Sequence, residues 1–428
     1  MSSTSPHAPA PAAPAGRWRD AARATGLLGA DGVPRPTIFA EMSALAARTG
    51  AVNLGQGFPD VDGPESVKRV AAEAIAAGVN QYPPGPGAPE LRAAVAAHQL
   101  RHYGLAVDPG TEVLVTTGAT EAVAAALLAL TEPGDEVLTL EPFYDSYAAV
   151  IALAGARHTT APLVATAGGF RLDTDALRAA VTDRTRVILL NTPHNPTGAV
   201  LTREELAAVA EVAERHDVLV VTDEVYEHLT YDGAEHVPFA TLPGAAGRTL
   251  TISSAGKTFS FTGWKIGWVT GPAPLVDAVR AVKQFLTYTS GAPFQPAVAH
   301  ALDLETTDGP DAGYVRGLRD SLAARRDLLS AGLSAAGFTV VRPQGTYFVV
   351  ADAAALLSGP LAGHGLRDAA DLCRALPGLA GVVGVPVGAF THPGSAADAA
   401  LRTAVRFTYV KQEPVLRAAV DRLAALTV

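Results

Sequence analysis

Two lysines lie eight residues apart in a loop rich in glycine, serine and threonine. Lys257 and Lys265 stand in the stretch from Ser253 to Lys265, in a chain whose 33 basic residues include only five lysines. Unlike arginine, lysine can lose its proton and condense with an aldehyde. The small residues, the hydroxyls and the second lysine are what a bound phosphate needs. The loop therefore points to an aldehyde that carries a phosphate, which suggests pyridoxal phosphate (PLP).

Two other lysine motifs do not fit this loop. Gly256-Lys257-Thr258 could end a nucleotide-binding P-loop, but that motif needs a glycine five positions earlier, where Thr251 stands. Ser254 and Lys257 could be the nucleophile pair of a penicillin-binding enzyme, but none of the five lysines is followed by Thr-Gly. A surface loop with a solvated Lys257 stays open as an alternative on this evidence alone.

Polar side chains follow two predicted strands at the points where they end. In an open parallel sheet, ligands bind beyond the carboxyl ends of the strands. Val187–Leu190 leads into a rigid loop with Asn195 and Pro196, whose peptide bond is a candidate for the cis form, although an ordinary turn is the alternative. Val218–Thr222 leads into Asp223. A carboxylate there must be paired, so Asp223 is either a helix N-cap or the partner of a protonated ring nitrogen.

A third strand leads into a turn that opens a helix. Val113–Thr117 is followed by Gly118, Ala119, Thr120 and Glu121. The free N–H groups and the dipole at the start of a helix favour a phosphate. Many helices begin with Thr and Gly, so this signal is weak by itself.

Short apolar runs alternate with Ala/Leu-rich helical stretches from about residue 65 to residue 300. Several of the runs are almost continuously apolar, as expected for strands that helices cover on both faces. The alternation predicts an α/β fold with a large three-layer domain and a mostly parallel sheet. The remaining predicted strands are Glu136–Leu140, Leu250–Ile252 and Gly267–Thr270, and the predicted helices are Pro89–Tyr103, Glu121–Leu130, Arg203–His216 and Pro274–Phe285.

The pattern changes after about residue 310 and predicts a smaller α+β domain. Its predicted elements are Tyr314–Ala336, Phe338–Val341, Thr346–Val350, Arg367–Leu376, Gly381–Val387, Val405–Val410 and Glu413–Leu426. We expect a disordered tail over 1–16, a segment over 17–62 that packs on the small domain, a large PLP-binding domain over 63–305 and the small domain over 306–428.

Composition excludes several classes of protein. The net charge is −9 and no basic tract occurs, which argues against nucleic acid or an anionic membrane as a partner. The single cysteine, Cys373, excludes a disulfide framework and a cysteine metal cluster. Because His-Glu-x-x-His is absent and the eleven histidines are scattered, no metal site is expected. The Pro/Ala-rich start lacks the features of a signal peptide, and no apolar run is long enough to span a bilayer, so we expect a cytoplasmic protein.

Taken together, eight short motifs in a fixed order resemble one enzyme family. The chain looks like a fold-type I PLP enzyme, a class I aminotransferase. Within that class it is most similar to the subgroup of kynurenine/glutamine aminotransferases and bacterial N-succinyldiaminopimelate aminotransferases. The matching stretches are Asn53–Asp60, Asn80–Tyr82, Glu141–Tyr144, Asn195–Gly198, Asp223–Tyr226, Ser254–Lys257, Gly263–Trp268 and Val405–Phe407.

This resemblance implies a role for each residue that holds the cofactor. Lys257 should bind PLP as a Schiff base and later move the proton between the substrate Cα and cofactor C4′. Asp223 should keep the pyridine nitrogen protonated. Asn195 and Tyr226 should hydrogen-bond the 3′-oxygen, and Phe143 should stack on the ring. The implied phosphate ligands are Ala119 (through its N–H), Thr120, Ser254, Lys265 and, from the other subunit of a homodimer, Tyr82.

The resemblance also implies how the substrate binds. Arg406 should bind the α-carboxylate through two parallel hydrogen bonds (a bidentate pair), together with Asn195 and the N–H of Gly57. Phe39 and Tyr144 are expected to line the space for the substrate side chain. Arg406 could not be chosen among 28 arginines without the resemblance.

Substrate choice is less well specified. No arginine stands near Phe285–Gly291 for a distal carboxylate, which argues against strict aspartate specificity. The small residues Ser290 and Gly291 suggest a roomier pocket than in kynurenine-type relatives, although other loops could fill the space. The expected reaction moves an amino group between an α-amino acid and a 2-oxo acid, with glutamate/2-oxoglutarate as one pair. Candidate donors are N-succinyldiaminopimelate, kynurenine, glutamine and methionine.

Two other functions remain as alternatives. A PLP-dependent β-lyase acting on cysteine conjugates would use the same residues but would yield pyruvate and ammonia. A non-catalytic ligand-sensing module of a transcription regulator would need an N-terminal DNA-binding domain, and the roughly 35 residues before the core are too few for one.

Overall fold

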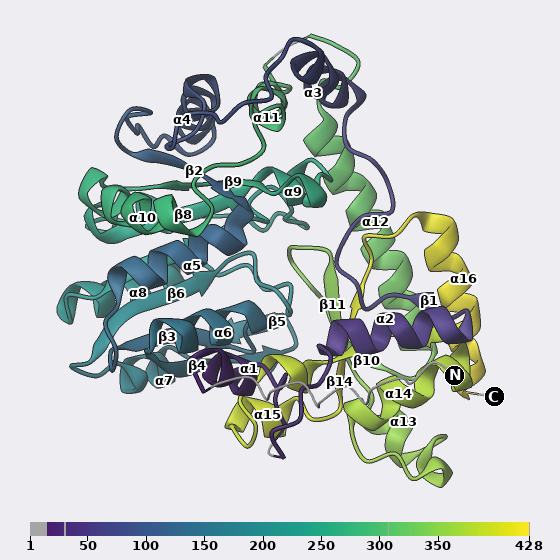
Figure 1. Cartoon of the computed structure of the whole chain (residues 1–428). Coiled ribbons are helices and arrows are strands. Elements are labelled where there is room, and N and C mark those ends of the chain that lie inside the picture. Colours follow the sequence, from purple (N-terminus) through teal and green to yellow (C-terminus); the bar gives the residue numbers. More distant parts are fainter. Residues whose placement is uncertain (1–14, 30, 307, 428) are drawn as a thin grey trace, which may run out of the picture.

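The computed structural model describes residues 15–29, 31–306 and 308–427, and the expected tail over 1–14 lies outside these ranges. A large mixed sheet, of strand order β2-β9-β8-β7-β6-β3-β4-β5, occupies the left part of the molecule in the view of Figure 1. β9 runs antiparallel to both of its neighbours and β5 antiparallel to β4, whereas the other strands run parallel. The bounds are β2 (Val113–Thr117), β3 (Glu136–Glu141), β4 (Arg157–Thr166), β5 (Gly169–Leu172), β6 (Thr185–Asn191), β7 (Leu219–Asp223), β8 (Thr249–Ser254) and β9 (Ile266–Thr270).

Helices cover both faces of this sheet, because the central strands are apolar on both sides. On β6, Val187 and Leu189 pack into one core, and Ile188 and Leu190 pack into the opposite one. Burial on both faces is what a parallel sheet between two helical layers requires. One layer consists of α5 (Gly118–Leu130), α6 (Asp145–Ala154) and α10 (Ala273–Leu286), and the other contains α7 (Thr174–Ala180) and α8 (Arg203–Arg215).

A third group of helices packs near the β2 end of the sheet. It shares one apolar core with β2, β9 and the aromatic side chains of Phe259 and Phe261. Its members are α3 (Glu65–Ala76), α4 (Pro89–Tyr103) and α11 (Phe294–Leu302), and the short helix α9 (Ala255–Thr258) lies next to them.

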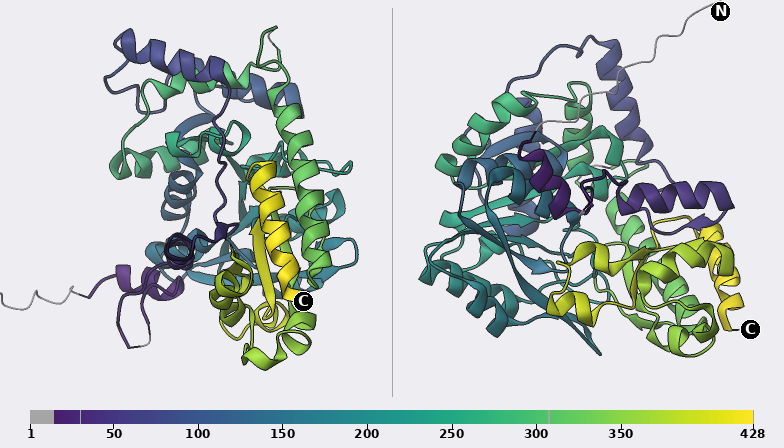
Figure 2. Two further views of the ribbon diagram at one scale, coloured as in Figure 1. Left: turned by 90° about the vertical axis from the view of Figure 1, so that its right-hand side faces the viewer. Right: turned by 60° about the horizontal axis from the view of Figure 1, so that its bottom comes forward.

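A smaller antiparallel sheet, of order β10-β11-β14-β13, forms beside the large one. A separate parallel pair joins β1 to β12. Helices α12 and α16 pack side by side, as the left view of Figure 2 shows. The bounds are β1 (Val52–Asn53), β10 (Thr339–Val341), β11 (Phe348–Asp352), β12 (Val382–Val383), β13 (Val385–Pro386), β14 (Ala404–Thr408), α12 (Tyr314–Ala335), α13 (Ala354–Ser358), α14 (Ala369–Ala380), α15 (Ala396–Ala400) and α16 (Glu413–Leu423).

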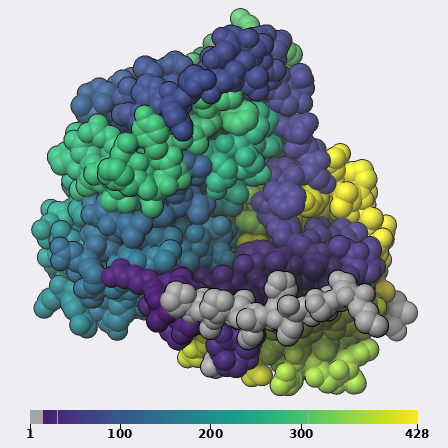
Figure 3. Space-filling model, in the orientation of Figure 1, coloured from purple at the N-terminus to yellow at the C-terminus, as the bar shows by residue number. Residues whose placement is uncertain are grey.

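The N-terminal segment divides between the two sheet regions. Helix α2 (Ile38–Thr49) packs against α14, and Glu41 accepts a hydrogen bond from Arg374 at 2.8 Å. Helix α1 (Trp18–Ala24) packs instead on α6, where Arg17 donates to the carbonyl of Leu153 at 3.0 Å. Figure 3 shows this segment, in purple, across the front of the molecule. The position of α1 on α6 differs from the expectation that the whole segment packs on the small domain.

The predicted fold class is confirmed, and most predicted elements recur with end shifts of one to three residues. Several elements of the large region were not predicted, among them α3, α6, β4, β5, α7 and α11. Helix α6 is followed directly by Gly155 in the left-handed region (φ 77°), so little loop separates it from β4. Within the described ranges, no helix is long and apolar enough to cross a membrane.

Candidate active site

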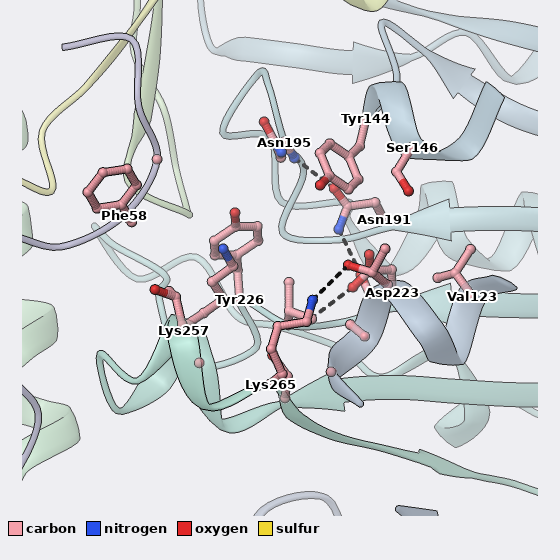
Figure 4. Close-up of a pocket in the computed structure, with 18 of the residues that line it drawn as sticks. Phe58, Val123, Tyr144, Ser146, Asn191, Asn195, Asp223, Tyr226, Lys257 and Lys265 are labelled. Atoms are coloured by element: carbon pink, nitrogen blue, oxygen red, sulfur yellow. Dashed lines mark hydrogen bonds between the residues drawn. The ribbon is translucent and has the colours of Figure 1, made fainter. Parts of the chain in front are cut away.

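A cavity of about 350 Å³ opens where strands of the large sheet end. β6 ends at Asn191, β7 at Asp223 and β8 at Ser254, so parallel strands deliver three polar residues to one edge. Figure 4 shows polar residues from several of these elements around the cavity, with Phe58 on the opposite side. The lining includes Phe39, Gln56, Gly57, Phe58, Ala119, Thr120, Tyr144, Tyr147, Asn191, Asn195, Asp223, Tyr226, Ser254, Lys257, Lys265, Phe348 and Arg406.

Asp223 lies at the buried end of the cavity and has a defined partner. The Tyr147 hydroxyl donates to Asp223 Oδ2 at 2.7 Å, and the Val225 N–H lies 3.4 Å from Oδ1. The amide of Asn191 holds the backbone by donating to the Asp223 carbonyl at 2.8 Å. Burial raises the pKa of the Asp223 carboxyl to about 6, and the Tyr147 hydrogen bond only partly opposes this rise. A cation placed against this carboxyl would favour its charged form.

Lys257 projects from the one-turn helix α9 toward aromatic side chains. Its Nζ lies 5.9 Å from the ring centre of Tyr226 and 5.9 Å from that of Tyr347. Tyr226 and Tyr347 are buried, and their rings meet edge to face at 5.3 Å. Burial, with Tyr347 adding to it, raises the pKa of the Tyr226 hydroxyl well above its ordinary value. Tyr226 is therefore a neutral hydrogen-bond donor at neutral pH.

The start of α5 lies at the other end of the cavity and is a position that favours an anion. The side chain of the N-cap residue Thr117 makes no capping hydrogen bond, and the Glu121 carboxylate accepts from the Thr117 N–H; Ala119 and Thr120, in the first turn, line the cavity. Gly267 lets β9 approach this turn, because a Cβ there would lie 2.7 Å from the Gly118 carbonyl carbon. Lys265 Nζ lies 3.5 Å from Thr120 Oγ1. Burial, and then the charge of Lys257, lower the pKa of Lys265.

Arg406 is buried on β14 and held at two corners of its guanidinium. Nη1 donates to Asn195 Oδ1 and Nη2 to the Gly55 carbonyl, both at 2.9 Å. The guanidinium carbon lies 4.1 Å from the ring centre of Phe348 and 4.7 Å from that of Phe390. Its Nε is buried without a partner among the described residues. Burial lowers the pKa of Arg406 to about 10. A buried cation without a carboxylate partner is suited to bind an anionic ligand.

The sequence-derived substrate residues also meet at this cavity. The ring centre of Phe39 lies 5.3 Å from the guanidinium carbon of Arg406, and the ring of Tyr144 packs edge to face against that of Tyr147. Gly57 accepts a hydrogen bond from the Tyr347 hydroxyl at 2.6 Å. A Cβ at Gly57 would lie 2.4 Å from Phe348, so the close approach there requires glycine.

Phe143 does not reach the cavity, and the prediction that it stacks on the cofactor ring does not fit its position. Its ring is buried in the core of α5 and α6, with ring centres 4.6 Å from His158 and 5.0 Å from His392. The adjacent Tyr144 lines the cavity instead. Successive residues in this extended segment point to different sides, so a shift of one position separates a wall residue from a core residue.

Tyr82 and the loop at Ser290 and Gly291 also lie outside the cavity lining. The Tyr82 side chain is 79% exposed and contacts Tyr288 edge to face at 5.4 Å. The Ser290 hydroxyl lies 2.9 Å from that of Thr117. Ser290 and Gly291 were expected to widen the substrate pocket. In the structure of the single chain they do not line the cavity.

Sequence reasoning missed Tyr147, Asn191 and Tyr347. Tyr147 is the hydrogen-bond partner of Asp223 although 76 positions separate the two residues. No local pattern in the sequence encodes such a contact. The predicted cis peptide bond at Asn195–Pro196 is confirmed.

The residues present fit PLP on three structural grounds. The uncapped start of α5, with Lys265 beside it, suits a phosphate. The buried Asp223 carboxyl suits a protonated ring nitrogen, and the amine of Lys257 reaches the space between these two ends. With the fold, this arrangement defines a PLP-dependent transferase.

The chain belongs to the family "Aminotransferase class I and II", which matches residues 49–423. It is a PLP-dependent aminotransferase. It is 57% identical over 394 residues to a probable N-succinyldiaminopimelate aminotransferase of Mycobacterium tuberculosis, covering 91% of this chain and 96% of that protein. It is 37% identical over 390 residues to a methionine aminotransferase of Escherichia coli, covering 91% and 96%. The solved structure of the N-succinyldiaminopimelate aminotransferase from M. tuberculosis superposes with a TM-score of 0.87 at 53% identity, covering 97% of this chain and all of that one.

Proposed function

We propose that the chain transfers the amino group of N-succinyldiaminopimelate to 2-oxoglutarate and catalyses the reverse reaction. The observation that supports this substrate is the 57% identity, over almost the full length, to a probable N-succinyldiaminopimelate aminotransferase. The cavity is also consistent with it: a buried arginine binds one carboxylate, and exposed Phe58 borders a mouth through which a long side chain can extend.

When bound, PLP supplies an electrophilic aldehyde and a ring that takes up the electrons left at the substrate Cα. Lys257 attaches the cofactor and moves a proton to and from that Cα. Asp223 holds a proton at the ring nitrogen, because its charge is stabilised there by a cation and by the Tyr147 hydroxyl. Asn195 and Tyr226 donate hydrogen bonds to the phenolic oxygen of the cofactor. The residues we assign to the phosphate are Ala119, Thr120, Ser254 and Lys265.

Arg406 is the residue we assign to the substrate α-carboxylate. Its bonds to Asn195 and Gly55 fix the plane of the guanidinium before the substrate arrives, and the stacked phenylalanines exclude water around it. Gly57 contributes a backbone N–H on the same side, and Phe39 and Tyr144 form walls of the side-chain space. We propose that Tyr144, in place of Phe143, packs against the cofactor ring.

We predict that Arg406→Lys raises KM for every amino acid substrate by about 30-fold or more. The substitution keeps a charge but removes the two-pronged bond, and truncating a buried charged pair costs about 2–5 kcal/mol. Steady-state kinetics with several amino acids measures the change. Arg342→Lys, at an exposed arginine paired with Asp232, is the control and should leave KM unchanged. An unaltered KM in the Arg406 variant would show that another residue binds the carboxylate.

A panel of amino donors with 2-oxoglutarate tests the substrate. We expect kcat/KM for N-succinyldiaminopimelate to exceed that for kynurenine, glutamine, methionine and aspartate by about tenfold or more, as differential pocket contacts permit. Glutamate formation is the readout. A higher value for any other donor would contradict the substrate assignment, and pyruvate and ammonia from cysteine conjugates without glutamate would favour the β-lyase alternative.

We further propose that the active unit is a homodimer. Each chain then has a large domain at 63–305 and a small domain at 306–428, and the enzyme is located in the cytoplasm. Tyr82 (79% exposed) contacts Tyr288, and Phe285, three positions before Tyr288 in the chain, is 89% exposed; exposed aromatic side chains are typical of an interface. If Tyr82 donates to the partner's cofactor phosphate, Tyr82→Phe should weaken cofactor binding by about tenfold, the worth of one bond to a charged group. Cofactor titration measures this, sedimentation reports the oligomeric state, and a monomeric active enzyme would contradict the proposal.

A further inference from the structure

Three histidines from distant parts of the chain meet outside the cavity described above. His98 and His102 stand four positions apart on one face of α4, and His228 follows β7 by five residues. The Nε2 atoms of His98 and His228 are 2.8 Å apart, and one ring nitrogen from each histidine lies within 4.8 Å of the other two. We call these three residues the histidine cluster.

Hydrogen bonding alone leaves this cluster incompletely satisfied. When two neutral imidazoles face each other through Nε2, only one of these two nitrogens can carry a proton. That ring donates the hydrogen bond, and the Nε2 lone pair of the other ring accepts it. His98 is only 2% exposed, and its Nδ1 is buried with no partner among the described residues. No other hydrogen bond therefore fixes which nitrogen of His98 carries the proton.

Carboxylates surround the cluster and supply negative charge. Glu305 Oε2 lies 3.5 Å from His102 Nε2. Glu227 is buried beside the cluster and accepts hydrogen bonds from the hydroxyls of Tyr103, at 2.6 Å, and Ser253. Arg101, the adjoining cation, is directed to the Leu302 carbonyl at 2.8 Å. Arg316 and Arg319 lie farther out, along the larger cavity next to His102 and His228.

We infer that the histidine cluster binds one Zn²⁺ or a similar divalent transition-metal ion, with a fourth position for water or for the carboxylate of Glu305, which lies beside His102. Tetrahedral zinc takes nitrogen and oxygen ligands at about 2.0–2.2 Å, which places neighbouring ligand atoms about 3.3–3.5 Å apart. The Nε2 atoms of His98 and His228 need to part by about 0.5 Å, and His102 already places a ring nitrogen within 4.8 Å of both. Three imidazoles suit zinc, whereas Mg²⁺ and Ca²⁺ prefer oxygen ligands. This site departs from the sequence-based expectation of no metal.

The site adjoins the back of the active-site segment. Within one short stretch, Asp223 and Tyr226 line the cavity while Glu227 and His228 turn to the cluster. Tight backbone bonds hold this stretch, with Glu227 N–H donating to the Glu224 carbonyl at 2.8 Å. A bound ion would tie α4 to the segment that positions the cofactor, without contacting the substrate. The role is structural, and it does not depend on the proposed substrate.

Zinc binding by the untagged, PLP-loaded, full-length protein tests the inference, because a histidine tag would itself bind the probe. Titration with ZnCl₂ in a calorimeter, and metal content after dialysis, should give one Zn²⁺ per chain. His102→Ala and His228→Ala should each weaken binding by at least about tenfold, a loss seen even for residues that only support metal ligands. His364→Ala, at an exposed histidine on a 3₁₀ turn, is the matched control and should bind as the wild type does.

A second measurement covers the case in which His228→Ala does not fold. The His102 side chain is 23% exposed, so its removal leaves a smaller defect. Co²⁺ in place of Zn²⁺ should give the visible absorption of a four-coordinate ion in the wild type and not in His102→Ala. A wild type that binds no Zn²⁺ at micromolar concentrations, or equal binding by the wild type and His102→Ala, overturns the inference.

Discussion

Replacement of Lys257 by alanine is expected to lower turnover of every amino donor by about 10⁴-fold or more. A single positioned acid–base group contributes up to about 10⁴-fold, and Lys257 also attaches the cofactor. Its amine is positioned among Tyr226, Tyr347 and Asp223, and within the described residues no other lysine except Lys265 lines the cavity. Amino-transfer kinetics measures the loss, and borohydride treatment followed by peptide mass analysis reports whether the cofactor is covalently fixed at residue 257.

Two controls separate this role from a general loss of charge or structure. Lys68→Ala removes a lysine that forms ion pairs with Asp62 and Glu65, and it should retain full activity and borohydride fixation. Added small amines should partly restore proton transfer to Lys257→Ala, because the space left by the side chain can admit them. Full activity of Lys257→Ala, or fixation of the cofactor at another lysine, would contradict the assigned mechanism.

Asp223→Asn is expected to affect stability and activity in opposite directions. In the cofactor-free protein the pKa of Asp223 is about 6, above the ordinary value of 3.8, so the folded state binds this proton more tightly than the unfolded state. The buried charge of Asp223 therefore lowers the free energy of unfolding. This loss is absent below about pH 4, grows as pH rises, and is complete above about pH 6, where it amounts to about 3 kcal/mol. Asparagine removes the charge but weakens one hydrogen bond, so we expect a net gain of about 2 kcal/mol at neutral pH.

The same substitution should lower kcat of the cofactor-loaded enzyme by about 10³-fold, because a neutral amide cannot hold a proton at the ring nitrogen. Unfolding of cofactor-free wild type and Asp223→Asn, compared across pH 4 to 8, gives the stability difference. Glu204→Gln, at an exposed carboxylate of α8, is the control and should show no such pH-dependent gain. A difference that does not change with pH would show that burial of Asp223 carries no electrostatic cost.

Strand ends were the features most open to prediction. The apolar runs before Asn191 and Asp223 alternate with helices, so a parallel sheet and the edge where ligands bind follow from periodicity. The contact of Tyr147 with Asp223 could not follow, because it joins two segments far apart in the chain. The assignment of Phe143 instead of Tyr144 illustrates a related limit: a pattern locates a segment, whereas the direction of each side chain depends on its packing.

The histidine cluster could also be predicted only in part from the sequence. His98 and His102 have the i, i+4 spacing that places two imidazoles on one face of a helix, and the helix itself was predicted. His228 lies 130 positions from His98, and only the packing of α4 against the segment after β7 brings them together. Scattered positions in a sequence therefore do not imply scattered positions in space.

Helix α1 is attached to α6, and helix α2 to α14. The chain between them, residues 25–37, includes two prolines and so resists compression. A rotation of the smaller sheet against the larger one would therefore strain this connector. The length of this connector thus limits how far the two sheet regions can separate. Inserted glycines there are expected to change the rates of substrate binding and release, and to leave the rate of the amino-transfer step unchanged.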